Sequence, residues 1–253
     1  MGIMMEKRDT IVNKATPLGG KIWFSFILLG LVGQLTWAVE NSYFSTYIQQ
    51  MITADSWATS ATVIFSAIFA AAATILGGAL VDRIGKRKPF VCFGYILWGL
   101  LTMAFALFGN EAYVNDAQSI TLIVIAFVAM DSTMSFVGSF SNDAAFSAWV
   151  TDVTDITNRA FVDTVGSLFP LVAMVVILVG FSGYANSGQW SLFFAILGAI
   201  PVISGILGLF IFYDSPTLKP SADKTYLKQI SYGFKRENIK ENKMIYICFL
   251  GMM

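Results

Sequence analysis

The basic residues of this 253-residue chain are confined to alternate gaps between its long apolar segments. Six such segments are visible, at roughly 22–50, 57–81, 90–108, 119–148, 160–183 and 190–213. All sixteen Lys and Arg residues lie before the first segment, after the second, after the fourth or after the sixth. The gaps 51–56, 109–118 and 184–189 contain none. Because cytoplasmic loops are enriched in Lys and Arg, this pattern predicts a six-span membrane protein with a cytoplasmic N-terminus.

The composition agrees with a membrane protein and narrows the possible functions. Apolar and aromatic residues make up 56% of the chain and charged residues only 13%, with a net charge of zero. The basic residues are therefore expected to orient the spans in the membrane, and nucleic acid is not an expected partner. With no histidine and only two cysteines, we expect no metal site, no cofactor and no disulfide framework. We expect an all-α integral membrane protein that is not an enzyme.

The chain divides into four expected regions. Residues 1–21 form a polar cytoplasmic arm, and 22–213 carry the six spans. Residues 214–242 form a cytoplasmic loop that holds either an amphipathic surface helix or a solvated linker. Residues 243–253 begin a seventh span that is too short to cross a bilayer. We therefore expect the first half of a longer protein, with its second half as partner, whether as a natural half, a gene fragment or a cut piece.

The gap between the second and third segments carries the most specific motif. The pattern G-x-L-x-D-R-x-G-[RK]-[RK] is matched by Gly78, Leu80, Asp82, Arg83, Gly85, Lys86 and Arg87. Gly78 would let a neighbouring helix approach, and Gly85 permits a tight turn. Asp82 sits at the membrane surface and needs a cationic or dipolar partner. The motif resembles the loop 2–3 signature of the major facilitator superfamily in sequence, span number and side of the membrane.

This resemblance implies a fold and a gating role. It implies the six-helix N-terminal domain of a twelve-helix fold, built from two three-helix inverted repeats. It also implies that the motif, through Asp82, Arg83 and Arg87, holds the cytoplasmic gate against the second half; a purely topogenic basic loop is the alternative. Between the fourth and fifth segments, Arg159 and Asp163 are four residues apart and resemble the loop 4–5 region of the superfamily. A weak surface ion pair is the alternative there.

The fourth segment contains an acid where charge is costly. Asp131 lies about 12 residues into this segment, near the midplane at 1.5 Å per residue. At helical spacing, Asp131, Ser135, Gly138 and Asn142 share one small, polar face. This face suits the wall of a cavity for a hydroxylated solute. The alternative is that Asp131 is protonated or is satisfied by neighbouring Ser and Thr side chains.

The first segment has a second polar face. Gln34, Trp37, Glu40, Asn41 and Phe44 occupy one arc of roughly 120° by the 3.6-residue period. Aromatic rings stack on the C–H faces of a sugar while amides and carboxylates bind its hydroxyl groups. Packing of an aromatic stripe is the alternative interpretation.

Two short stretches resemble a sugar-carrier group within the superfamily. Gly33-Gln34-x-x-Trp37-Ala38-x-Glu40-x-x-Tyr43 is similar to the first span of sucrose-type carriers, and Gly85-x-Arg87-x-Pro89-Phe90 to their loop 2–3 ending. These belong near the glycoside–pentoside–hexuronide:cation symporters, which implies cation-coupled sugar uptake. Members similar to melibiose permease carry acids in the second span for a coupling cation, whereas residues 57–81 contain none. The coupling ion is therefore expected to be H⁺ rather than Na⁺.

The favoured expectation is a secondary transporter of the plasma membrane that works by alternating access. Glu40 and Asp131 would couple the proton, and the solute path would be lined by Gln34, Trp37, Asn41, Ser135 and Asn142. Three alternatives stay open: a membrane sensor or scaffold on a carrier fold, a drug or lipid carrier, and an integral-membrane enzyme. The last is disfavoured because no nucleophile–base pair is visible. The identity of the solute, the final choice between H⁺ and Na⁺ as coupling ion, the direction of transport and the oligomeric state are open.

Overall fold

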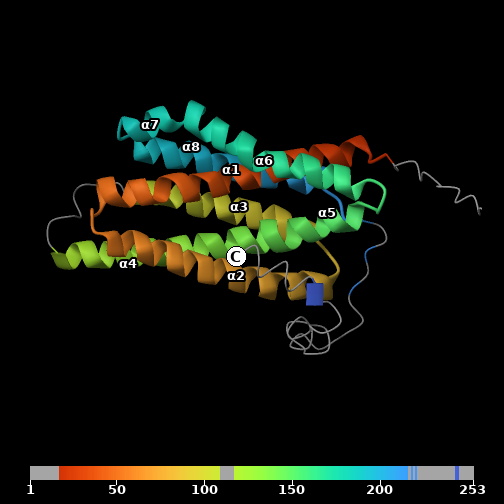
Figure 1. Ribbon diagram of the computed structural model, residues 1–253, viewed down its shortest axis with the longest axis horizontal. Helices are drawn as coiled ribbons and strands as arrows, with labels where there is room; N and C mark the ends of the chain where they lie inside the picture. Colours follow the sequence, from red (N-terminus) through yellow and green to blue (C-terminus); the bar gives the residue numbers. More distant parts are fainter. Residues whose placement is uncertain (1–16, 109–116, 216–217, 219, 221–242, 245–253) are drawn as a thin grey trace, which may run out of the picture.

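The computed structural model describes residues 17–108, 117–215, 218, 220 and 243–244, and within these ranges it contains helices and connecting segments but no strand (Figure 1). The amphipathic helix expected within 214–242 and the seventh span expected from 243 lie almost wholly outside the described residues. So does most of the expected arm 1–21. These expectations remain predictions.

Among the described residues, six helical stretches are long and apolar enough to cross a membrane, as the sequence predicts. The elements are α1 (Gly20–Met51), α2 (Ser56–Ile84), α3 (Lys88–Ala104), η1 (Phe105–Leu107), α4 (Ala117–Gly138), η3 (Ser139–Phe146), α5 (Ser147–Val153), α6 (Arg159–Gly180), α7 (Ser182–Asn186) and α8 (Trp190–Ile211). The spans are α1, α2, α3 with η1, α4–η3–α5 read as one continuous stretch, α6 and α8. The fourth span is therefore interrupted by η3, a π-helical segment of eight residues.

The helix order gathers the described basic side chains at one end of the bundle. α1 begins there with Lys21, and α2 ends there with Arg83. α3 begins there with Lys88, and α6 begins there with Arg159 (Figure 1). We call this the basic end. Its charge is what the alternating pattern of the sequence requires if the helices cross a bilayer.

The outward surface of the bundle is apolar. Many large side chains of α2 and α6 are exposed, among them Ile64 and Ile68 at 57% each and Val175 at 60%. A soluble monomer rarely leaves contiguous apolar surfaces of this kind in water. Lipid tails are as apolar as these side chains, so their exposure is unpenalised inside a bilayer.

The end of the bundle away from the basic end is packed by aromatic rings. Phe44 lies 4.6 Å from Phe105 between ring centroids, and Phe105 lies 4.9 Å from Phe127. Tyr47 lies 5.1 Å from both Trp190 and Phe194. All these rings are buried. Tilted and edge-to-face contacts of this kind join α1, η1, α4 and α8 into one block.

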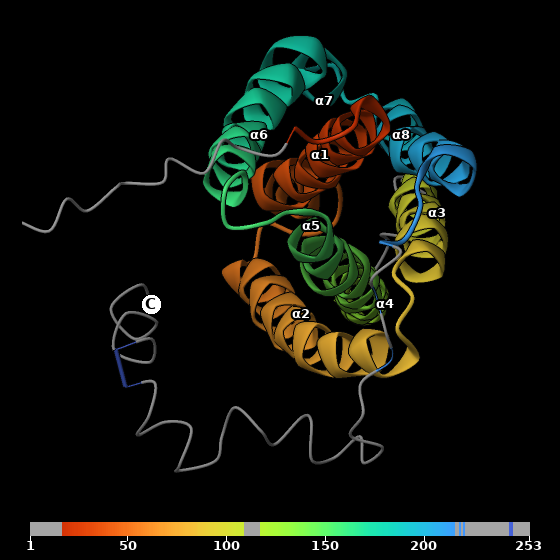
Figure 2. The same cartoon turned by 90° about the vertical axis from the view of Figure 1, so that its right-hand side faces the viewer.

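Glycines allow a close helix approach between α3 and α8, which lie side by side in Figure 2. A Cβ atom at Gly99 would lie 2.5 Å from the carbonyl oxygen of Gly198. A Cβ atom at Gly198 would lie 2.5 Å from Cγ of Met103. No side chain larger than hydrogen fits at either position, because the backbones themselves are in contact.

We expect Gly198→Val to lower the free energy of unfolding by about 1–3 kcal/mol, since the added methyl groups force α3 and α8 apart. Thermal unfolding of the detergent-purified protein measures this. The matched control is Gly180→Val, where a Cβ atom would meet nothing within 4 Å. Equal melting temperatures for the two variants would contradict the tight α3–α8 contact.

Candidate functional site

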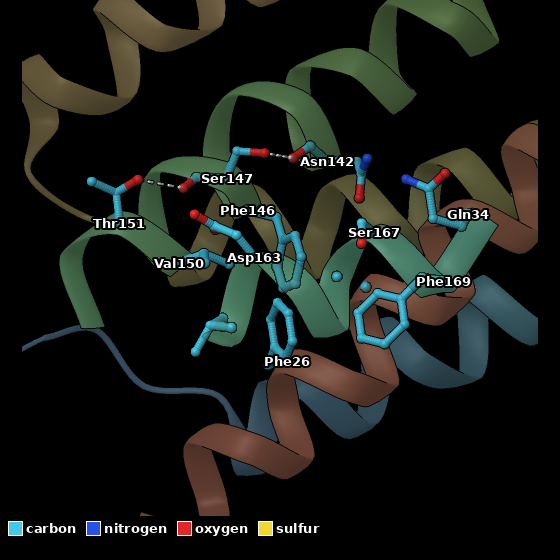
Figure 3. Close-up of a pocket in the computed structure, with 13 residues that line it drawn as sticks. Phe26, Gln34, Asn142, Phe146, Ser147, Val150, Thr151, Asp163, Ser167 and Phe169 are labelled. Atoms are coloured by element: carbon cyan, nitrogen blue, oxygen red, sulfur yellow. Dashed lines mark hydrogen bonds between the residues drawn. The ribbon is translucent and has the colours of Figure 1, made fainter. Parts of the chain in front are cut away.

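A pocket of about 450 Å³ lies between α1, the η3–α5 segment and α6, and we call it the inner pocket. Its polar lining comes from Gln34, Asn142, Ser147, Thr151, Asp163 and Ser167. Figure 3 shows the amides of Gln34 and Asn142 pointing toward one another at one side of it. The pocket runs from the first turn of α6, at the basic end, to the middle of α1. Its volume is within the usual range for small-molecule sites, about 300–1,000 Å³.

Three phenylalanine rings form the apolar wall of the inner pocket. Phe26 stacks on Phe146 with 6.3 Å between centroids and lies 5.1 Å from Phe169. Gly30 makes this possible, because a Cβ atom there would lie 2.5 Å from the Phe169 ring. Rings beside amides and hydroxyl groups offer both an apolar surface and directional hydrogen bonds to a ligand.

The π-helical segment places the polar residues of the fourth span. Directly after η3, the hydroxyl of Ser147, the first residue of α5, donates to the carbonyl oxygen of Asn142, five residues earlier, at 3.3 Å. A π-turn is wider than an α-turn and rotates the side chains that follow it. Asn142 and Asp143 therefore both take part in the site, although regular helical spacing puts only Asn142 on the polar face. π-Segments occur frequently at functional sites.

Asn142 has a hydrogen-bond partner on α3 and lies close to α1. The Tyr95 hydroxyl on α3 lies 2.8 Å from Oδ1 of Asn142 and 2.8 Å from the carbonyl oxygen of Leu29. The single Tyr95 proton serves one of these acceptors at a time. Gly33 on α1 leaves the necessary space, since a Cβ atom there would lie 2.4 Å from Asn142 Oδ1. The amide nitrogen of Asn142 donates to Asp143 at 2.8 Å.

Asp143 is a site residue that the sequence analysis did not identify. Its carboxylate also accepts hydrogen bonds from Ser139 and from Trp37, whose indole nitrogen is its single donor. Asp143 is exposed on its remaining side in the described bundle. Its position directly after Asn142, in a serine-rich stretch of an apolar span, was a usable signal. With regular α-helical spacing, however, Asp143 falls outside the polar face of the fourth span.

A second cluster joins Glu40 of α1 to Asp131 of α4. The Ser135 hydroxyl lies 2.9 Å from Glu40 Oε1 and 2.9 Å from the carbonyl oxygen of Asp131. Asp131 is completely buried, and neither of its carboxylate oxygens accepts a hydrogen bond from the described residues. The alternative that serine or threonine side chains satisfy this carboxylate therefore finds no support in the described part of the chain.

The three acids form a row in order of burial. Asp143 is exposed, Glu40 is half-buried and Asp131 is buried. Glu40 lies within electrostatic range of both of the others. Glu40 of α1 therefore interacts electrostatically with two acids of the fourth span that are twelve positions apart in the sequence, Asp131 and Asp143. Among the described side chains, no group of three His, Cys, Asp or Glu could hold a metal ion.

The predicted solute residues do not all meet in one place. Gln34 and Asn142 line the inner pocket. Trp37 packs on Trp98, with 5.1 Å between centroids, and contacts Asp143 instead. Asn41 is exposed and donates to the Trp37 carbonyl oxygen at 2.9 Å. Ser135 belongs to the Glu40–Asp131 cluster.

At the basic end, Arg87 joins two helices of the gating motif to the fourth span. Its Nη2 lies 2.7 Å from Asp82 of α2, and its Nε lies 2.8 Å from Asp152 of α5. Burial disfavours the charged guanidinium, but the hydrogen bonds to Asp152 and Asp82 outweigh it and raise the pKa of Arg87. Asp82 thus has the cationic partner that the sequence required. Asp152, the second partner of Arg87, is brought to it only by the tertiary structure.

The segment after α8 holds the gating loop in place. Asp214 Oδ1 accepts hydrogen bonds from the backbone N–H groups of Arg87 and Lys88, both at 2.8 Å. These are the first unpaired donors of α3, so Asp214 acts as its cap. The turn expected at Gly85 is present, with φ of 66°, and a Cβ atom there would also lie 2.6 Å from the Pro220 nitrogen.

The remaining motif residues take different positions. Arg83 and Lys86 are exposed and form no ion pair with a described residue. A Cβ atom at Gly78 would meet nothing within 4 Å, so the close helix approach expected there occurs instead at Gly77, against Phe140. Arg159 and Asp163 share the first turns of α6, as expected. The Arg159 guanidinium donates to the Thr151 carbonyl oxygen at 2.9 Å, whereas Asp163 lines the inner pocket.

We expect Arg87→Lys to lower the free energy of unfolding by about 1.5–3 kcal/mol, because a lysine ammonium cannot bridge two carboxylates as a guanidinium does. Chemical or thermal unfolding in detergent measures the loss. The control is Arg83→Lys, which should stay within about 0.5 kcal/mol of the parent. If the two variants unfold alike, Arg87 does not stabilise this junction.

Comparison with known protein families gave a match. A sequence model described as Major Facilitator Superfamily matches residues 22–253. Neither the curated proteins nor the solved structures gave a match.

Proposed function

Because this chain belongs to the Major Facilitator Superfamily, whose members are membrane transporters, we propose that it mediates proton-coupled symport of a sugar or glycoside. Its described bundle is a six-helix half of that fold, and transport proceeds by alternating access, with one half rocking against the other. The basic end faces the cytoplasm in this proposal, and the membrane is the plasma membrane.

The observation that carries the sugar proposal is the lining of the inner pocket. Gln34 and Asn142 offer amide donors and acceptors, and Asp163 offers a carboxylate, beside the Phe26–Phe146–Phe169 wall. A polyol with C–H faces matches this mixture better than a wholly apolar drug or lipid does. The proposal places the solute here, open to the basic end.

Asn142 supports a physical link between solute and proton. It lines the inner pocket and at the same time donates to Asp143. A solute hydroxyl that bonds to Asn142 competes with this contact and changes the hydrogen bonding of the Asp143 carboxylate. By linkage, a proton bound at Asp143 then changes the affinity for the solute, and the solute changes the affinity for the proton.

The Ser135 hydroxyl has more acceptors than it has protons, and this supports a proton-exchanging role for Glu40. One Ser135 hydroxyl proton faces two acceptors, Glu40 Oε1 and the Asp131 carbonyl oxygen. A protonated Glu40 would donate to the Ser135 oxygen and free that hydroxyl to serve the carbonyl, so both contacts are satisfied at once. The buried Asp131 carboxyl, without a partner among the described side chains, is the second exchange site.

We expect Asp131→Asn to reduce gradient-driven uptake at least tenfold and to flatten its dependence on pH, because the amide takes up no proton. Uptake of labelled sucrose and related glycosides into proteoliposomes, with an imposed pH gradient, measures this for the full-length protein. Asp55→Asn, at an exposed N-cap away from the acid row, is the control. Unchanged uptake and pH dependence in Asp131→Asn would overturn its coupling role.

We expect Gln34→Ala to raise KM about fivefold with little change in protein stability, which corresponds to one net hydrogen bond of about 1 kcal/mol. The same uptake assay gives KM. Gln49→Ala is the matched control, since Gln49 is exposed near the end of α1. Failure of every glycoside tested, in a stably folded protein, would favour a drug or lipid carrier, or a sensor on this fold.

A further inference from the structure

An apolar groove of about 420 Å³ lies on a different face of the bundle, between α3 and the α4–η3 helix. Phe90, Phe93 and Leu97 line one side, and Phe136, Val137 and Phe140 the other. Every side chain in its lining is apolar, unlike the inner pocket. Phe93 is 60% exposed and Leu97 48% exposed, so the groove is open to the surroundings of the bundle.

The floor of this groove is part of the helix packing. Gly94 brings α3 against η3, because a Cβ atom there would lie 2.3 Å from Cβ of Ser141. Near the basic end, Phe90 contacts Phe140 edge to face, with 5.6 Å between centroids. Phe140 is in turn fixed against Gly77 of α2. The groove is thus bounded by side chains that are held by close contacts.

The length of the groove fits one leaflet of a bilayer. From Pro89 to Leu97 it follows α3 for about 12 Å at 1.5 Å per residue. The hydrocarbon core is about 30 Å thick, so the groove covers a little less than half of it. A transmembrane helix packed on this face would need a groove along the whole span. An acyl chain of one leaflet needs only this length.

One end of the groove is positively charged. Lys88 directly precedes Pro89 in the first turn of α3, and Lys86 and Arg83 lie exposed in the adjoining loop. The nearby acids are engaged: Asp82 and Asp152 pair with Arg87, and Asp214 accepts from two backbone amides. No ion pair to a described residue neutralises Arg83, Lys86 or Lys88. Basic pockets between spanning helices are sites for anionic lipid headgroups.

We propose that this groove is a binding site for an anionic phospholipid of the leaflet at the basic end. One acyl chain lies between Phe93 and Val137, and the phosphate group contacts Lys88 and Lys86. The proposal depends on the membrane-spanning fold and on charge complementarity, and not on which solute is transported. The lipid also touches the loop that carries Arg87, so its headgroup charge adds to the electrostatics of the gating motif.

The test is photocrosslinking of the full-length protein in nanodiscs that contain trace phosphatidylglycerol with a diazirine in one acyl chain. Peptide mass spectrometry locates the adducts. We expect them in residues 89–97 and 136–140, and far fewer with the matched phosphatidylcholine probe. Phosphatidylglycerol adducts should fall by about 30-fold in the Lys86→Gln/Lys88→Gln double variant, because each surface cation contributes about fivefold. Lys21→Gln, also at the basic end, should leave them unchanged.

A second pair of variants tests the groove itself. Val137→Trp fills it and should abolish groove adducts from both probes, whereas Val175→Trp, on the exposed face of α6, should not. Equal labelling by the two probes, or labelling that survives Lys86→Gln/Lys88→Gln, would overturn the headgroup contact. Absence of groove adducts in the parent protein would overturn the site and indicate that another part of the protein covers this face.

Discussion

A bilayer offers a spanning chain no hydrogen bonds from water, and the rest of the structure depends on this constraint. The backbone meets it by forming helices, in which each N–H has an internal partner. Hydroxyl side chains meet it by bonding to carbonyl oxygens one turn earlier, as Thr36, Thr62 and Thr102 do. The carboxylate of Asp131 does not meet it within the described bundle. A buried carboxyl group without a hydrogen-bond partner costs free energy, and an apolar side chain would pack there without that cost. A functional role is therefore expected for Asp131.

The polar interior is organised by close backbone contacts rather than by charge alone. Gly33 gives Asn142 and Tyr95 room to meet between three helices, and Gly30 does the same for the Phe169 ring of the inner pocket. The π-helical segment then presents Asn142 and Asp143 to different neighbours. The aromatic block at the far end fixes the helices around this site. The aromatic end and the polar end of the described bundle are therefore held together by packing contacts.

The fold could be predicted well because it follows from properties that can be read along the sequence. Apolar length and the alternation of basic residues predicted six spans, and the described part of the chain contains six. Their ends lie within a few residues of those predicted, except for the fourth span, which runs on to Val153. The site was predicted only in part. Gln34 and Asn142 line the inner pocket, but Trp37 and Ser135 belong to separate clusters. Helical periodicity tells which side chains share a face, and it does not tell which neighbouring helix that face meets.

The sequence by itself determined the number of spans, the charged end and the acid of the motif that needs a cation. Each of these depends on local composition or spacing. The thickness of the bilayer sets the length of an apolar span, and basic residues favour the cytoplasmic side. Tertiary structure decided that Arg87 bridges Asp82 to Asp152, that Asp214 caps α3, and that Asp143 joins the polar row. These partners are separated by up to 127 residues. Their meeting depends on helix packing and on one wide turn in the fourth span, and neither is encoded in a periodic pattern.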